Sequence, residues 1–164
     1  MIKKIIFVLI IFVSIAASSQ APKLSNDATI TVFTCGRGEE LYSTFGHTAL
    51  RVKDDANQLD VVFNYGTFDF RTENFYLKFV KGDLQYFLSV SSYEDFIIQY
   101  QIEKREVIEQ TLNLTMQQKQ KIFDALNNNI CSTDKYYTYK FIDRNCTTMV
   151  ADKINEILSG EKIT

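Results

Sequence analysis

Several segments of the chain have the alternating pattern of β-strands. Residues 28–34 (ATITVFT), 47–53 (HTALRVK) and 60–65 (DVVFNY) are rich in β-branched and aromatic residues that roughly alternate between two faces, which predicts strands. The polar run 54–58 (DDANQ) predicts a loop that joins the second and third segments into a hairpin. Further extended segments are predicted at 84–90, 105–114 and 136–141.

Other segments carry signals for the start or the end of a helix. Ser92 precedes residues 93–103 and Thr115 precedes a segment reaching about residue 127, and both hydroxyls suit an N-terminal cap. The segment 146–158 places its apolar residues on one face, which predicts an amphipathic helix. Shorter helices are predicted at 39–45 and 74–80, each before a glycine. Without repeats or a linker, the sequence predicts one α+β domain with a small antiparallel sheet and flanking helices.

The N-terminus has the order of a secretory signal peptide. Lys3 and Lys4 precede an apolar run of about 13 residues, and small or polar residues follow it. A membrane-spanning helix needs roughly 20 apolar residues, so cleavage is favoured over an anchor. We therefore expect a signal peptide at 1–21 and an exported, periplasmic domain at 22–164.

Composition excludes several functions. The chain has 164 residues and 18 basic against 20 acidic side chains, a net charge of −2, and so lacks the basic excess of nucleic-acid-binding proteins. His47 is the only histidine, which excludes zinc sites that need two histidines. We expect no metal, no cofactor and no nucleic acid, and any chemistry that needs imidazole must use His47.

Three cysteines in an exported chain leave at least one thiol unpaired within the monomer. Among the three pairings, a disulfide between Cys35 and Cys131 would leave Cys146 free. The alternative is three reduced cysteines that act as small hydrophobic residues.

Cys146 is the best candidate for a nucleophile. It lies at the start of a predicted helix, where free N–H groups and the helix dipole stabilise a thiolate and can bind an oxyanion. His47 opens a predicted strand, and Asn64 lies on the neighbouring strand. A cysteine, a histidine and a polar residue that orients the ring form the papain-type arrangement. The alternative interpretation is that His47 is structural and Cys146 is a buried small residue.

Four segments resemble one known family in order and approximate spacing. The segment 34–52 (TCGRGEELYSTFGHTALRV) is similar to the opening signature of the Bacteroidetes-type lipoprotein N-acyltransferases, in their N-terminal periplasmic domain. The later similar segments are 64–70 (NYGTFDF), 74–79 (NFYLKF) and 143–148 (DRNCTT).

The resemblance implies a circularly permuted papain-like (NlpC-type) thiol-enzyme domain, related to lecithin-retinol acyltransferase. It also implies that His47 is the base, Cys146 the nucleophile and Asn64 the residue that orients His47. The implied reaction moves an acyl chain from a phospholipid through a Cys146 thioester to the α-amine of a diacylated lipoprotein, at the membrane surface. No cofactor is implied.

Two features differ from that family. Arg37 stands where the family usually has proline, in a turn. Family members typically continue into a region with membrane-spanning helices, whereas this sequence ends at Thr164, which suggests a short homologue or a truncated reading frame. The alternatives to acyl transfer are a periplasmic cysteine peptidase or amidase that acts on cell-wall peptides, and a non-catalytic binding domain.

Overall fold

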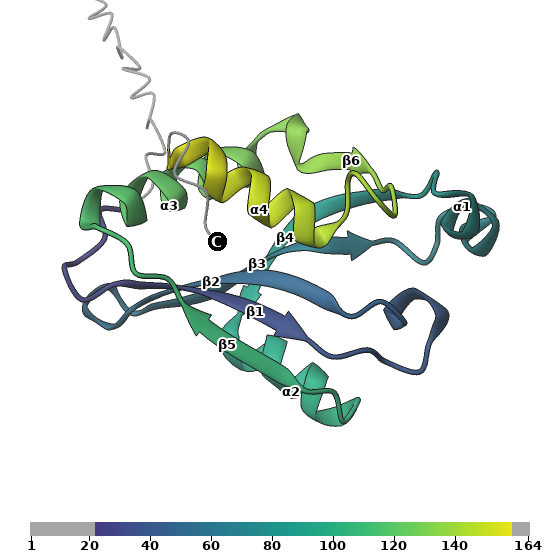
Figure 1. Cartoon of the computed structure of the whole chain (residues 1–164), viewed down its shortest axis with the longest axis horizontal. Coiled ribbons are helices and arrows are strands. Elements are labelled where there is room, and N and C mark those ends of the chain that lie inside the picture. Colours follow the sequence, from purple (N-terminus) through teal and green to yellow (C-terminus); the bar gives the residue numbers. More distant parts are fainter. Residues whose placement is uncertain (1–21, 159–164) are drawn as a thin grey trace, which may run out of the picture.

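The computed structural model describes residues 22–158 (Figure 1). The predicted signal peptide at 1–21 lies outside the described residues, as do residues 159–164.

The centre of the fold is one six-stranded sheet in the order β5-β1-β2-β3-β4-β6, with every neighbouring pair antiparallel. The consecutive strands β1 to β4 therefore lie side by side, as short connections favour. The predicted α+β class with an antiparallel sheet is confirmed. The strands are β1 (Thr29–Cys35), β2 (His47–Asp54), β3 (Leu59–Phe68), β4 (Gln85–Ser92), β5 (Val107–Thr111) and β6 (Tyr136–Thr138).

Helices cover both faces of the sheet (Figure 1). The helices are α1 (Phe75–Lys81), α2 (Tyr93–Ile102), α3 (Met116–Cys131) and α4 (Cys146–Ile157). Helices α3 and α4 lie over one face and enclose the larger core, which includes Leu50, Leu126 and Ile154. Helix α2 packs on the opposite face, where Phe96 stacks on Phe33. Helix α1 lies at the end of the sheet toward which the N-terminus of α4 points.

The predicted helix starts are confirmed by their caps. Ser92 accepts a hydrogen bond from the Asp95 N–H, and Thr115 forms a reciprocal capping box with Gln118. Such caps satisfy N–H groups that the first turn leaves without partners. Local sequence signals therefore suffice to place α2 and α3.

Three predicted elements are shorter in the structure. The helix predicted at 39–45 is a single 3-10 turn, Leu41–Ser43, in a loop where Ser43 O accepts from the N–H groups of Gly38 and Gly46. The strand predicted at 105–114 pairs only with β1, and its ladder ends at Thr111. The segment 136–141 pairs with β4 through Thr138 and then turns, closing a bridge between Lys140 and Arg144.

Candidate active site

Cys146 is the first residue of α4, as predicted. The helix starts there because Asn145 caps it: the Asn145 side chain accepts from the N–H groups of Thr147 and Thr148, each at 3.0 Å. The Thr148 hydroxyl in turn accepts from the Asn145 N–H at 2.9 Å. The Cys146 side chain is buried, with 9% of its surface exposed. Its thiol is therefore held by a rigid helix end.

The cap corrects one expectation about the oxyanion site. The Thr147 and Thr148 N–H groups are occupied by Asn145, so they are not free to bind an oxyanion. The Cys146 N–H has no acceptor among residues 22–158. This single N–H is thus the backbone donor that an oxyanion formed at Cys146 would meet.

His47 opens β2, where it lies opposite Cys35 of β1. Its Nε2 atom is buried and has no hydrogen-bond partner among residues 22–158. Burial lowers the pKa of His47 from 6.5 to about 4; a hydrogen bond with Asn64 opposes this shift and the charge of Arg105 adds to it. The imidazole is therefore neutral at pH 7, the state in which it can accept a proton.

Asn64 lies beside His47, as predicted, and Gly66 makes room for both side chains. The Asn64 Oδ1 atom accepts from the Gly66 N–H at 2.7 Å. A Cβ atom at Gly66 would lie 2.8 Å from His47 Nδ1, which is too close for unbonded atoms, and 3.1 Å from Asn64 Oδ1, which is a tight contact. The ladder between β3 and β4 also shifts register between Asn64 and Thr67. Gly66 thus lets the imidazole lie directly against β3.

His47 and Cys146 line one cavity of about 40 Å³. The structure therefore brings together the two residues that the sequence singled out. Burial raises the pKa of Tyr139 to about 12 and also raises that of Tyr86, so both phenols in the cavity are neutral. The aromatic residues of its wall are Tyr42, Phe45, Phe68, Phe79, Tyr86 and Tyr139.

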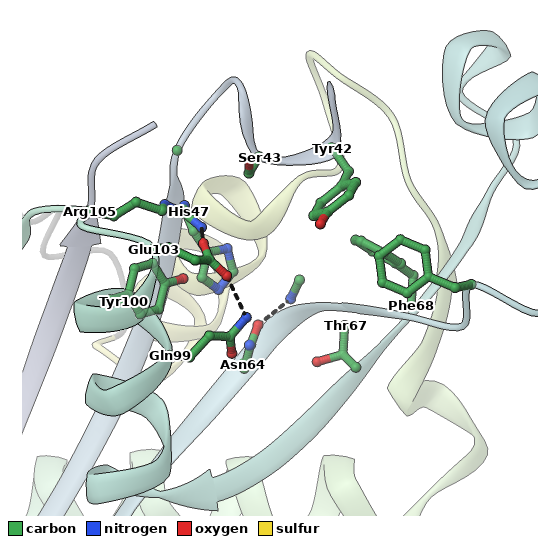
Figure 2. A pocket seen from close by; sticks show the side chains of 13 residues that line it. Tyr42, Ser43, His47, Asn64, Thr67, Phe68, Gln99, Tyr100, Glu103 and Arg105 are labelled. Carbon is green, nitrogen blue, oxygen red and sulfur yellow. Dashed lines mark hydrogen bonds and ion pairs between the residues drawn. The ribbon is translucent and has the colours of Figure 1, made fainter. Parts of the chain in front are cut away.

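Two larger spaces adjoin this cavity. Beside Cys146, a groove of about 310 Å³ runs between the rings of Phe45, Tyr139 and Phe141 and the first turn of α4. On the other side, His47 lines a pocket of about 250 Å³ together with Asn64 and the more polar residues of α2 and its C-terminal loop. Figure 2 shows this second pocket, including Gln99, Tyr100, Glu103 and Arg105.

The three cysteines lie on three different elements, β1, α3 and α4. All three are free thiols in the structure, and the disulfide considered between Cys35 and Cys131 stays a prediction. Cys35 is buried at the end of β1, between β2 and β5, whereas Cys131 is exposed at the C-terminal end of α3. Cys146 is nevertheless the unpaired thiol that shares a cavity with His47.

Sequence reasoning missed Gly66 and the wall made by Glu103 and Arg105. Gly66 had a usable signal, because it follows Asn64 by two positions and so lies on the same face of a strand. The wall made by Glu103 and Arg105 had no such signal in the sequence. Arg105 Nη1 pairs with Glu103 at 2.8 Å, and Arg105 Nε donates to Gly36 O at 2.9 Å, which joins two segments that are distant in the chain. Within residues 22–158, no group of His, Cys, Asp or Glu side chains is arranged to hold a metal ion.

The chain is thus an α+β domain with a candidate Cys–His site, in which a cysteine at a helix N-terminus and a neutral histidine line one cavity. The sequence matches the family described as the Lnb N-terminal periplasmic domain over residues 20–163, and the chain belongs to that family. The family resemblance and the periplasmic location predicted from sequence are thereby confirmed. No curated protein and no solved structure matches the chain. Among residues 22–158, no helix has the length and apolar character needed to cross a membrane.

Proposed function

We propose that this domain is a thiol acyltransferase that moves an acyl chain from a phospholipid to the N-terminal amine of a diacylated lipoprotein. The observation that carries the proposal is the cavity shared by Cys146 and His47, whose wall is largely aromatic. The groove beside Cys146 continues this aromatic lining through Phe45 and Phe141, and most of its lining surface is apolar. Such a lining suits an acyl chain better than the polar peptides of the cell wall.

The first half-reaction loads the enzyme. Neutral His47 takes the proton of the Cys146 thiol, and the sulfur attacks the carbonyl carbon of a phospholipid ester. The Cys146 N–H stabilises the oxyanion of the tetrahedral intermediate. The carbon–oxygen bond then breaks, and the lysophospholipid leaves with the proton from His47. A Cys146 thioester results, and Asn64 keeps the ring oriented throughout.

In the second half-reaction the lipoprotein amine is the nucleophile and the Cys146 sulfur is the leaving group. The free α-amine of the lipoprotein attacks the thioester carbonyl while His47 accepts a proton from the nitrogen. The carbon–sulfur bond breaks, an amide forms, and the proton returns to the Cys146 sulfur. The enzyme is regenerated without a cofactor.

The same proposal includes a circularly permuted papain-like fold. In papain-like enzymes the cysteine generally precedes the histidine in the chain, whereas here His47 precedes Cys146. Permutation reconciles this order with a helix that starts at the cysteine and packs on an antiparallel sheet bearing the histidine. The arrangement of α4 over β2 and β3 is the feature that supports it.

A hydrolase is the second candidate, because a polar pocket lies on the other side of His47. Glu103 and Arg105 line that pocket and suit a peptide ligand. In this alternative, the same thiol attacks a cell-wall peptide and water, rather than an amine, releases the product.

The test incubates the purified protein with phospholipid vesicles and a diacylated lipopeptide, and follows the products by mass spectrometry. We expect triacylated lipopeptide from the wild type and none from Cys146→Ser or His47→Ala. Without lipopeptide, an acyl adduct that hydroxylamine releases should accumulate on Cys146. Cys131→Ser is the matched control, because Cys131 is an exposed thiol outside the site and its loss should leave the yield unchanged.

Two outcomes would contradict the proposal. Unchanged lipopeptide, together with cleavage of muropeptide in a parallel incubation with that substrate, would identify the hydrolase. The absence of both products, with correctly folded protein, would indicate a non-catalytic binding domain.

A further inference from the structure

An unusual concentration of apolar side chains faces solvent at the α1 end of the molecule. On α1, Tyr76, Leu77 and Val80 are 60%, 54% and 64% exposed, while Phe75 and Phe79 fill the interior. Helix α1 is thus apolar on both its inner and its outer face. Two loops add to this surface, which we call the apolar rim: it consists of Phe45, Tyr76, Leu77, Val80, Phe141 and Ile142, with Phe45 and Ile142 73% and 84% exposed.

The apolar rim is continuous with the candidate site. The Phe141 ring lies 5.7 Å from the Phe45 ring and 5.7 Å from the Phe79 ring, so it joins the two loops to α1. The Lys140 ammonium also donates to Gly82 O at 2.8 Å, which ties the loop before α4 to the end of α1. Phe45 and Phe141 line the groove beside Cys146. A molecule resting on the rim would therefore meet the mouth of that groove.

Positive charge accompanies the rim. Lys78 and Lys81 lie in the last turn of α1, and neither forms an ion pair within residues 22–158. Nearby Asp83 is paired with Lys140 at 3.3 Å, which compensates its negative charge. Exposed apolar side chains flanked by unpaired lysines are typical of surfaces that enter the interface of a phospholipid bilayer, where the ammonium groups reach the phosphates.

We propose that the apolar rim docks this domain on the surface of a phospholipid bilayer and presents the groove beside Cys146 to the lipid. This inference rests on the proposed function in one respect: the bilayer would then also be the source of the acyl donor. The occupant is a bilayer rather than a second copy of the chain, because the two lysines complement lipid phosphates but would repel their symmetry mates across a twofold interface.

The test is co-sedimentation with vesicles of phosphatidylethanolamine and phosphatidylglycerol, using protein purified after export with its N-terminus checked by intact mass. We expect the wild type to bind and the double variant Leu77→Asp/Val80→Asp to lose at least about tenfold in partition coefficient. Both side chains are more than half exposed, so folding should be retained; circular dichroism checks this, and the single variant Val80→Asp provides an intermediate case.

The matched control is Ile98→Asp/Ile102→Asp. These residues are 51% and 76% exposed on α2, on the opposite face of the sheet from α4, and binding should stay within about twofold of the wild type. Cys146→Ser should bind vesicles as the wild type does. Vesicle binding can therefore be measured even if the domain does not transfer acyl chains. Absence of binding by the wild type, or equal losses in both double variants, would overturn the proposal. A wild-type dimer that Leu77→Asp/Val80→Asp dissociates, without vesicle binding, would assign the rim to a second copy instead.

Discussion

The side-chain hydroxyls of Thr48 and Thr147 lie 2.8 Å apart and form a hydrogen bond between β2 and α4. Each threonine directly follows one of the two candidate catalytic residues: Thr48 follows His47, and Thr147 follows Cys146. The bond therefore joins the strand that carries the imidazole to the helix that carries the thiol, at the level of the site. We therefore predict that both threonines act as positioning residues.

Removing this bond should lower both stability and acylation. We expect Thr48→Val to reduce the free energy of unfolding by about 1 kcal/mol, the net value of one neutral hydrogen bond. Because both single variants break the same bond, Thr48→Val/Thr147→Val should lose less stability than the sum of the two single losses. Urea unfolding measures this coupling, and the rate of acyl adduct formation on Cys146 reports the positioning. Strictly additive losses with an unchanged acylation rate would contradict the assignment.

Gly66→Ala should abolish activity by displacing the imidazole. The added methyl group would lie 2.8 Å from His47 Nδ1 and 3.1 Å from Asn64 Oδ1, so the imidazole must move and the Asn64 side chain must shift slightly. We expect a stability loss of about 1–3 kcal/mol, as for other overpacked sites, and a much larger relative loss of acyl transfer. Thermal unfolding and the lipopeptide assay measure the two effects separately.

Gly36→Ala is the matched control for that substitution. A Cβ atom at Gly36 meets its nearest neighbours, all in Glu106, at 3.4–3.5 Å, which is ordinary contact. Activity should therefore be retained. Equal activity losses in Gly36→Ala and Gly66→Ala would show that the loss does not come from contact with His47.

Much of the fold could be predicted because its signals are local. Ser92 and Thr115 each cap a helix through N–H groups only three residues away, so the sequence alone locates these helix starts. The same holds for Asn145, which fixes Cys146 at the first turn of α4. The same cap explains why the N–H groups of Thr147 and Thr148 are not free to bind an oxyanion. An N–H group that donates its hydrogen to the Asn145 side chain cannot also donate it to an oxyanion.

Long-range contacts account for what the sequence could not predict. Asp54 begins the polar run that predicts a loop, yet it is the last residue of β2 and is fully buried. Its carboxylate accepts from the Ser25 N–H at 2.7 Å and the Ser25 hydroxyl at 2.6 Å, so a distant segment satisfies its charge. The contact of Gly66 with His47 likewise depends on the packing of β3 beside β2. Alternation along β3 places Gly66 on the same face as Asn64, but it does not show which side chain of β2 packs there.

The low pKa of His47 predicts a specific dependence of stability on pH. Its pKa is about 4 in the folded chain and about 6.5 when the ring is exposed, so between these values the unfolded state binds a proton that the folded state does not. Stability should therefore fall as pH decreases from 6.5 to 4, with this group contributing up to about 1.4 kcal/mol per pH unit. Urea unfolding at a series of pH values measures the slope.

The control for that slope is His47→Gln, which keeps a polar side chain but cannot titrate in this range. Its unfolding free energy should depend less steeply on pH between 6.5 and 4 than that of the wild type. Parallel curves for the two proteins would show that the pH dependence comes from other groups.

The two thiols outside the candidate site, Cys35 and Cys131, should differ sharply in reactivity. Burial raises the pKa of Cys35 to about 11, an effect that a hydrogen bond with Tyr100 and the charge of Arg105 only partly offset. Because the thiolate is the reactive form, iodoacetamide at pH 8 should modify exposed Cys131 at least about a hundredfold faster than Cys35. Peptide mass spectrometry measures both rates in Cys146→Ser, with guanidinium-unfolded protein as the control in which the rates converge.

A disulfide-linked Cys35–Cys131 peptide in protein purified from the periplasm would contradict this prediction. It would mean that the oxidised chain departs from the strand pairing that encloses Cys35 between β2 and β5.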